Sequence, residues 1–239
     1  MNNNRIAVIL LSGGIDSATT AAVAKRDGYL LFALTFAYGQ KHDIEIKFAK
    51  HLLLSLSIKN HIVIEIPSII FSSSALLNKS KIEMPKNRDV LAMDDIPVTY
   101  VPARNILFLS YSIAYAESLG ASDIFIGANS IDYSGYPDCR PEFFMAYENM
   151  ANIGTKAGVM GKKFTIHTPL IDMKKSQIIC LGKSLGIDYS LTHSCYDPDE
   201  LGSSCGECDS CIIRKRGFLE AGFLDPTKYR KNTNVSFNK

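Results

Sequence analysis

The residues Ser-Gly-Gly-Ile-Asp-Ser at positions 12–17 follow an apolar run and have the types needed to hold an anion. Two glycines allow a sharp turn that brings backbone N–H groups close to a ligand, and a helix beginning near Asp16 directs its positive end there. The motif is not a Walker loop, because it has no lysine before its final serine. It therefore predicts a different kind of phosphate site. The alternative is an ordinary turn with Asp16 capping the helix.

A second group of reactive residues is a cluster of cysteines near the carboxyl end of the chain. Its members are Cys195, Cys205, Cys208 and Cys211. Four thiolates within a short stretch suit a tetrahedral Zn²⁺, but four cysteines also hold an iron–sulfur cluster, and the spacing leaves both open. Buried or reactive free thiols are the disfavoured alternative, because three of the cysteines recur at every third position. The sequence therefore predicts a metal centre.

Two further cysteines lie outside this cluster. Cys139 falls in a polar loop near the expected site, and Cys180 falls on an expected helix, where we expect it in the core. Because the chain is expected in the cytosol, we expect no disulfides.

The loop at residues 132–144 carries side chains that fit a flat, polar ligand. Tyr133 and Tyr136 can stack on a ring, Asp132 or Asp138 can accept from a guanine-like N–H/NH₂ edge, and Arg140 can pair with a carboxylate. An ordinary surface loop is the alternative interpretation.

Arg104 belongs to the stretch Val-Pro-Ala-Arg-Asn at the start of an expected helix. A positive charge there opposes the helix dipole. We therefore expect an anion close to Arg104.

Alternating apolar runs and amphipathic segments predict the elements that must position these residues. The expected strands are 5–11, 29–36, 61–66, 123–128 and 164–170, and the expected helices are 16–26, 45–56, 103–120, 141–157 and 174–186. This order predicts an α/β fold with an open parallel sheet and helices on both faces. Ligands of such sheets bind beyond the carboxyl ends of the strands, where Ser12, Tyr38 and Asn129 fall. Residues 67–101 are expected to form a long, partly mobile loop, a candidate lid.

Composition narrows the class of protein. The chain has 239 residues, of which 46% are hydrophobic and 21% charged, with a net charge of +2. We expect one α/β domain at 1–190 and a small metal-binding region at 191–239. The near-neutral charge gives no reason to expect stable nucleic-acid binding, and no apolar run is long enough for a signal peptide or a membrane span. A cytoplasmic protein is expected.

Ser-Gly-Gly-x-Asp-Ser after a first strand resembles the loop of the PP-loop ATP pyrophosphatases. Together with Tyr-Gly-Gln at 38–40, Val-Pro-Ala-Arg-Asn at 101–105, Asp-Tyr-Ser-Gly-Tyr-Pro-Asp-Cys-Arg at 132–140 and the cysteine cluster, it resembles the 7-cyano-7-deazaguanine synthase family over residues 6–216. Two positions depart from the family pattern: Ala103 stands where glycine is usual, and His193 precedes Ser-Cys-Tyr. Neither is an assigned site residue.

The resemblance implies an adenylating ligase of queuosine precursor synthesis that converts 7-carboxy-7-deazaguanine and ammonia to the nitrile. In the wider superfamily the loop holds the departing pyrophosphate. The implied ligands are ATP with Mg²⁺, one structural Zn²⁺ per chain, and a second copy in a homodimer. Arg104 or Lys174 is expected to assist at the α-phosphate.

The resemblance also implies the site residues. The ATP-binding residues are Leu11, Ser12, Gly13, Gly14, Ile15, Asp16, Ser17, Ala18, Thr19, Thr20 and Ala21. The catalytic residues are Asp16, Ser17 and Arg104. The substrate-binding residues are Tyr38, Gln40, Asp132, Tyr133, Tyr136, Asp138 and Arg140. The zinc ligands are Cys195, Cys205, Cys208 and Cys211.

Two rival functions use the same features. A tRNA-thiolating PP-loop enzyme would use cysteines or a cluster on an activated base, but it binds a large polyanion, which the charge does not favour. A zinc ribbon that binds nucleic acid or protein would use Arg214, Lys215 and Arg216 beside Phe218. We interpret these three basic residues as a solvated helix face.

Overall fold

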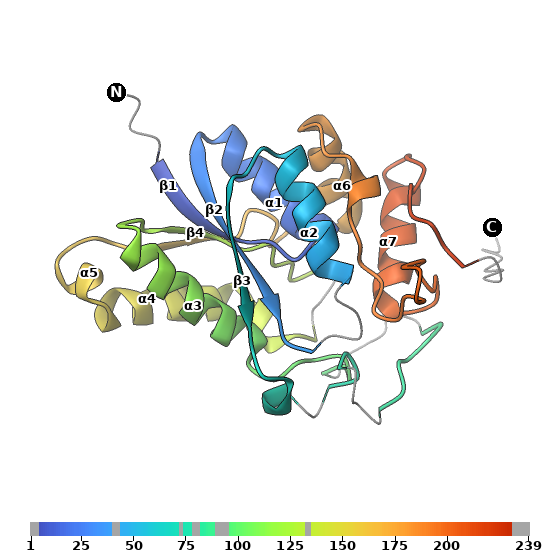
Figure 1. Cartoon of the computed structure of the whole chain (residues 1–239), viewed down its shortest axis with the longest axis horizontal. Helices are drawn as coiled ribbons and strands as arrows, with labels where there is room; N and C mark the ends of the chain where they lie inside the picture. The colour runs from blue at the N-terminus through green and yellow to red at the C-terminus, as the bar shows by residue number, and fades with distance from the viewer. Residues whose placement is uncertain are drawn as a thin grey trace.

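Five parallel strands form the central sheet of the computed structural model (Figure 1). The structure describes residues 5–39, 44–71, 74–77, 82–88, 96–131 and 135–230. The strands are β1 (Arg5–Leu10), β2 (Tyr29–Ala37), β3 (Asn60–Glu65), β4 (Asp123–Phe125) and β5 (Thr165–His167), and their order across the sheet is β3-β2-β1-β4-β5. The order reverses between β1 and β4, which is where such sheets bind ligands.

Seven α-helices accompany these strands in the described part of the chain. They are α1 (Ile15–Arg26), α2 (Ile44–Ser55), α3 (Arg104–Ser118), α4 (Pro141–Gly154), α5 (Lys156–Val159), α6 (Lys175–Ser184) and α7 (Asp209–Glu220). Three short 3₁₀ turns are η1 (Ser68–Phe71), η2 (Pro137–Cys139) and η3 (Tyr189–Leu191).

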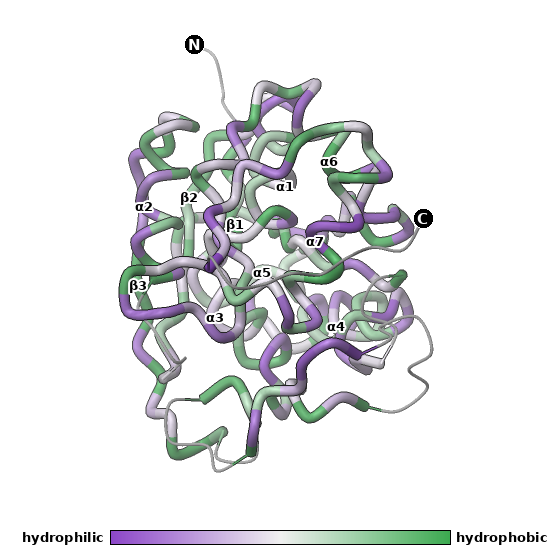
Figure 2. The backbone as a smooth tube through the Cα atoms, turned by 90° about the vertical axis from the view of Figure 1, so that its right-hand side faces the viewer, coloured by the Kyte–Doolittle hydropathy of each residue, from purple (hydrophilic) through white to green (hydrophobic). Residues whose placement is uncertain are grey.

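Both faces of the sheet are covered, as the hydrophobic run of β1 predicts. Ala7 and Ile9 pack into a cluster with α1, α2 and α6, whereas Val8 and Leu10 pack into a second cluster with α3 and α4. Helix α2 lies at the outer edge of the molecule in Figure 2, and hydrophilic and hydrophobic residues alternate along it. The predicted fold class is therefore confirmed.

The predicted element boundaries differ from the observed ones in several places. The pairing of β4 and β5 ends at Phe125 and His167, so both strands are shorter than predicted. The helix expected at 141–157 divides at Thr155, which caps α5 by accepting from the Gly158 amide. Cys180 lies on α6 as expected, but it is exposed, and its placement in the core was wrong.

The described parts of residues 67–101 contain one regular element, η1. Several of their side chains are buried in the cluster beneath α3, including Phe71, Ala75 and Leu77. This segment thus contributes to the core. Within the described ranges, no helix is both long and apolar enough to cross a membrane.

Candidate nucleotide-binding site and metal centre

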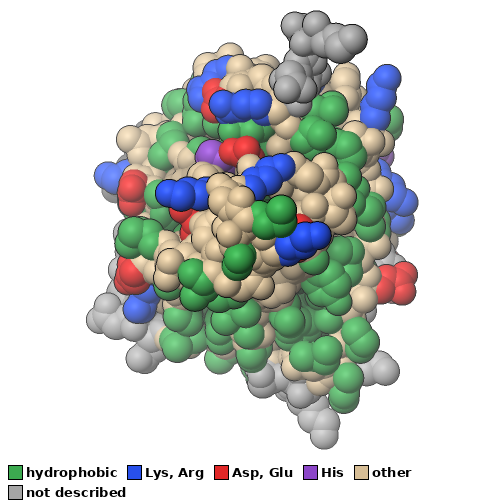
Figure 3. Space-filling view, turned by 90° about the vertical axis from the view of Figure 1, so that its left-hand side faces the viewer, with side chains coloured by type: hydrophobic (Ala, Val, Ile, Leu, Met, Phe, Trp, Pro, Cys, Tyr) green, Lys and Arg blue, Asp and Glu red, His purple; other side chains and the backbone are tan. Residues whose placement is uncertain are grey.

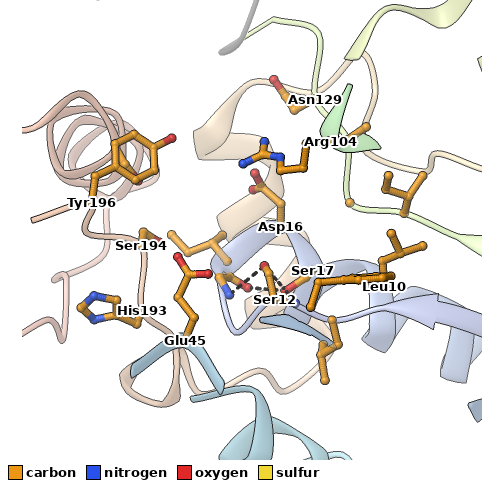
Figure 4. A pocket seen from close by; sticks show the side chains of 18 of the residues that line it. Leu10, Ser12, Asp16, Ser17, Glu45, Arg104, Asn129, His193, Ser194 and Tyr196 are labelled. Atoms are coloured by element: carbon orange, nitrogen blue, oxygen red, sulfur yellow. Dashed lines mark hydrogen bonds between the residues drawn. The ribbon is translucent and has the colours of Figure 1, made fainter. Parts of the chain in front are cut away.

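A cavity of about 250 Å³ opens at the carboxyl ends of β1, β2 and β4. Asp16 from α1, Arg104 from α3 and Asn129 after β4 converge on it, and Glu45, His193 and Ser194 lie on its other side (Figure 4). Segments far apart in the sequence therefore meet where the topology places a ligand.

The glycine-rich loop joins β1 to α1 and lines this cavity. Gly13 has a φ of 89°, and a Cβ there would lie 2.7 Å from the Glu45 carbonyl oxygen, so the turn requires glycine. The Ser12 hydroxyl lies 3.2 Å from the Ser17 hydroxyl, which donates to the Gly14 carbonyl at 3.1 Å. Because α1 begins at Ile15, its first N–H groups point toward the cavity.

The predicted ATP-binding segment divides into two parts. The residues that line the cavity are Leu11, Ser12, Gly14, Ile15, Asp16 and Ser17. Gly13 shapes the turn behind them. Ala18, Thr19, Thr20 and Ala21 are buried in α1, and the Thr19 hydroxyl bonds the Ile15 carbonyl and the Tyr189 hydroxyl. These four residues support the loop from inside the helix.

The glycine-rich loop has no Walker lysine, but a lysine at the start of α6, Lys175, lies next to it. Lys175 Nζ donates to both carboxylate oxygens of Asp16, at 2.6 Å and 2.8 Å, and the lysine side chain is only 7% exposed. This pair places a buried ammonium group next to the glycine-rich loop. Lys174, which was predicted with Arg104 as a candidate cation, is exposed and lies outside the lining, whereas its neighbour Lys175 lies in it.

A second cationic side chain, Arg104, also lines the cavity, and Figure 4 shows it beside Asp16. The Arg104 guanidinium lies 3.5 Å from the Tyr38 hydroxyl. Burial by itself lowers the pKa of Arg104, but the tyrosine oxygens of Tyr38 and Tyr136 and the Asp138 carboxylate together raise it. The anion expected near Arg104 is thus Asp138.

Asp138 is buried and holds the first turn of α3. Its Oδ2 accepts from the Asn105 amide at 3.1 Å, and its carbonyl accepts from the Asn105 side chain at 2.8 Å. This contact joins η2 to α3 and positions Arg104. Ala103 precedes the helix in a left-handed conformation, with φ 55°, which explains why glycine suits this position.

Of the other predicted substrate-binding residues, two line the cavity, one lies outside its lining and three are not described by the structure. Tyr38 and Tyr136 are buried and line the cavity, and the Tyr136 hydroxyl lies 2.6 Å from the Thr99 hydroxyl. Arg140 is exposed at the start of α4 and does not line the cavity. Gln40, Asp132 and Tyr133 lie outside the described residues.

Cys139 is near the site as expected. It lines the cavity, and burial raises the pKa of its thiol to about 12, so it is protonated at neutral pH. We therefore assign it no nucleophilic role.

The four predicted metal ligands come together. The Sγ atoms of Cys195, Cys205, Cys208 and Cys211 lie within 4.8 Å of one another, and all four residues are buried. Ligands 2.3 Å from a tetrahedral metal lie roughly 3.8 Å apart, so the cluster has nearly the required size. Backbone amides donate to three of the sulfurs, for example Cys205 N to Cys195 Sγ at 3.2 Å. Such donors stabilise thiolates, and the cluster fits a metal ion.

The segment between η3 and the cysteine cluster joins this cluster to the glycine-rich loop. His193 N donates to the Gly13 carbonyl at 2.9 Å, two residues before the predicted ligand Cys195. Arg214 of α7 is 2% exposed and donates to the Thr192 hydroxyl, the Tyr189 carbonyl and Asp225. The interpretation of 214–216 as a solvated face was therefore wrong for Arg214, although Arg216 is exposed.

Sequence reasoning missed Lys175, but a signal for it was present. The buried face of α6 contains Ile178, Ile179 and Gly182, which follow Lys175 by three, four and seven positions. Helical periodicity therefore places Lys175 on the inward face and Lys174 off it. Arg214 left a weaker signal, since it faces the same side of α7 as the buried Phe218.

The parallel sheet, the loop without a Walker lysine and the cavity at the switch point define a nucleotide-binding α/β protein of the PP-loop type. The family described as "Queuosine biosynthesis protein QueC" matches residues 6–222, and the chain belongs to this family.

Similar curated proteins cover nearly the whole chain. A 7-cyano-7-deazaguanine synthase from Desulfatibacillum aliphaticivorans is 56% identical over 225 residues, which cover 93% of this chain and 96% of that protein. A protein of the same name from Solidesulfovibrio magneticus is 54% identical over 226 residues, covering 94% of this chain and 95% of that protein.

Proposed function

We propose that this chain is an ATP-dependent ligase that converts 7-carboxy-7-deazaguanine and ammonia to 7-cyano-7-deazaguanine. The observation that carries the proposal is the loop at 12–17, which directs the start of α1 and the Asp16–Lys175 pair at one cavity. This arrangement suits the phosphates of ATP without a Walker lysine. The names of the similar proteins support the choice of acceptor.

The chemistry requires two adenylations. The carboxylate attacks the α-phosphate of one ATP and releases pyrophosphate, and ammonia then displaces AMP to give the amide. The amide oxygen attacks the α-phosphate of a second ATP and releases a second pyrophosphate. Loss of AMP and of both N–H protons of the amide then gives the nitrile. Each adenylate must be kept from water, which a buried cavity favours.

The cationic groups take separate roles in this proposal. The loop, with Ser12 and Ser17, would hold the departing pyrophosphate, and Asp16 would supply a carboxylate ligand to the Mg²⁺ that accompanies ATP. Lys175, rather than Lys174, stabilises charge on the phosphates from the α6 side. Arg104, which also lines the cavity, is proposed to assist at the α-phosphate or at the carboxylate of the substrate.

The substrate ring is proposed to lie on the Arg104 side of the cavity. Tyr38 and Tyr136 supply the buried aromatic lining there. Gln40, Asp132 and Tyr133 are proposed to bind the substrate, and Asp138 is proposed to act through Asn105 and Arg104. Arg140, which is exposed, is proposed to meet the carboxylate of an incoming substrate at the rim.

The cysteine cluster is proposed to hold one structural Zn²⁺ rather than an iron–sulfur cluster. All four ligands come from residues 195–211, and their burial leaves no ligand position facing solvent. A closed Cys₄ site of this kind contributes folding free energy. Residues 1–190 and 191–239 remain the proposed division between the catalytic and zinc-binding regions.

We also propose a cytoplasmic homodimer. Hydrophobic side chains gather on the face turned to the viewer in Figure 3, on the side of α4 and α5. The exposed apolar residues of these helices are Met145, Met150, Ile153, Val159 and Met160. Exposed apolar patches of this kind commonly mark protein interfaces.

Product analysis by mass spectrometry tests the proposed function. Zinc-replete protein is incubated with Mg-ATP, ammonium and 7-carboxy-7-deazaguanine. The proposal expects the nitrile together with AMP and pyrophosphate. AMP without nitrile would point to another acceptor, and the absence of ATP cleavage would contradict the proposal.

A further inference from the structure

Gly217 of α7 lies directly against the aliphatic stem of Lys175. A Cβ at Gly217 would lie 2.4 Å from Lys175 Cγ and 2.9 Å from Lys175 Cβ, and 3.1 Å from Ile179 Cδ1. These atoms belong to the rigid beginning of the lysine side chain and to a buried residue of α6. A methyl group at position 217 therefore cannot be accommodated unless α6, α7 or the lysine moves.

The position of the lysine stem determines where its ammonium reaches. Lys175 is 6% exposed, and its Nζ contacts both oxygens of Asp16 across the gap between α6 and α1. A shift of the stem near the backbone is carried to the tip of the side chain. The close approach of α7 thus limits where the positive charge lies relative to the glycine-rich loop.

The place of α7 is itself set by the metal centre. Cys208 precedes the helix and Cys211 lies in its first turn. One turn further on, Arg214 ties the helix to the segment that carries His193 and Cys195. Gly217 follows Arg214 by three residues, on the turn that meets α6.

We propose that Gly217 is a positioning residue for the nucleotide site: the close contact between α7 and the Lys175 stem holds the ammonium at the phosphate end of bound ATP. The metal centre and Arg214 act through this contact. The inference rests on the proposed role of Lys175 toward ATP, and it adds that a residue outside the cavity lining sets the position of that charge.

Binding of α,β-methylene ATP with Mg²⁺, measured by titration calorimetry on zinc-loaded full-length protein, tests the inference without turnover. Gly217→Ala is expected to weaken binding by about tenfold, because a charge-assisted contact is displaced. Gly154→Ala is the matched control, since a Cβ there meets only Met150 Sδ, at 3.8 Å. Zinc content is measured for each variant and is expected to be equal.

A double-mutant cycle separates positioning from general destabilisation. Lys175→Met keeps most of the stem but removes the charge, and it is expected to weaken binding by about tenfold or more. In that background, Gly217→Ala is expected to change binding less than about twofold. Two results would overturn the inference. One is that the fold-changes in affinity caused by the two substitutions multiply in the double variant, and the other is that Gly217→Ala alone leaves the affinity unchanged.

A folding measurement covers the case in which Gly217→Ala does not fold. Removal of the obstructing stem, both Cγ and Cβ, in the double variant Lys175→Gly/Gly217→Ala is expected to restore a cooperative thermal transition. If the double variant also remains unfolded, the stem is not the obstacle and the inference fails. The proposed function is judged separately, by nitrile formation in the unsubstituted protein.

Discussion

Two cation–carboxylate arrangements supply the two cations that line the cavity, Lys175 and Arg104, and they are built in different ways. In the first, Lys175 pairs directly with Asp16, and the two residues come from helices far apart in the sequence. In the second, Asp138 caps α3 through Asn105 and acts on Arg104 without a direct bond. The first arrangement is supported by α7 and the metal centre, the second by η2 and α3.

Because the two arrangements have different supports, we expect a substitution in one support to affect mainly the cation that it holds. The metal centre reaches the loop through His193 and reaches Lys175 through Gly217. Asp138 and Arg104 are held by contacts within η2 and α3. Damage to the cysteine cluster should therefore affect the phosphate side first, and damage to Asp138 the substrate side.

The largest expected effect comes from removing the metal. Cys208→Ser takes away a buried ligand of the proposed zinc site. Structural zinc binding is worth on the order of 10 kcal/mol, so the thermal transition should move far down or disappear. Differential scanning calorimetry with and without a chelator measures this. Cys180→Ser, at an exposed position of α6, should leave the transition in place. Equal melting of Cys208→Ser and the unsubstituted protein would show that no structural metal is bound.

The second-largest effect is expected from substitution of Lys175, and it is compared with the same substitution at its neighbour Lys174. Lys175→Met should lower kcat/KM for ATP by roughly 10²–10³-fold, because it removes a preorganised charge at the phosphates. Lys174→Met, at the exposed position beside it, should leave kcat/KM within about twofold, since Lys174 does not line the cavity. Steady-state kinetics of both variants decides between them. A larger loss in Lys174→Met would restore the original expectation.

A smaller effect is expected on the Arg104 side. Asp138→Asn weakens the cap of α3 and removes the negative charge near Arg104, so the free energy of unfolding should fall by about 1–3 kcal/mol. The KM for 7-carboxy-7-deazaguanine should rise more than the KM for ATP. Asp27→Asn, in an exposed pair with Arg26, should change stability by no more than about 0.5 kcal/mol. A greater rise in the KM for ATP than for the acid would reverse the assignment of the two sides.

The smallest effect is expected from relieving the backbone strain at Ala103, the residue before Arg104. Ala103 has a φ of 55°, a conformation that glycine adopts without strain. Ala103→Gly should therefore raise the free energy of unfolding by up to about 1 kcal/mol, as denaturant unfolding can measure. The same substitution at Ala221, where φ is −77°, should lower it. A lower free energy of unfolding in Ala103→Gly would contradict this expectation. It would show that the alanine methyl stabilises the fold by more than its positive φ destabilises it.

The sequence predicted the fold and the loop because both depend on local patterns. The apolar run before Ser12 and the two glycines define a strand, a turn and a helix start within one short segment. The cysteine cluster was equally visible, since its ligands lie close together in the sequence and the fold had only to close one loop around them.

The contacts between distant segments were not predicted. Lys175 was missed in favour of its neighbour because the partner Asp16 lies 159 positions away, and only tertiary packing brings the two together. Arg214 was taken for a solvated residue because its partners, Tyr189, Thr192 and Asp225, lie in segments without regular periodicity. Such pairings depend on how helices pack, which a single sequence does not record.

The measurement that tests the central claim most directly is the ratio of AMP to nitrile formed. Chromatography with mass spectrometry quantifies both products, together with the amide and ADP, during steady turnover from the acid. Two adenylations predict two AMP per nitrile from the acid and one AMP per nitrile when the amide is supplied instead. ADP in place of AMP, or nitrile formed without AMP, would contradict the account.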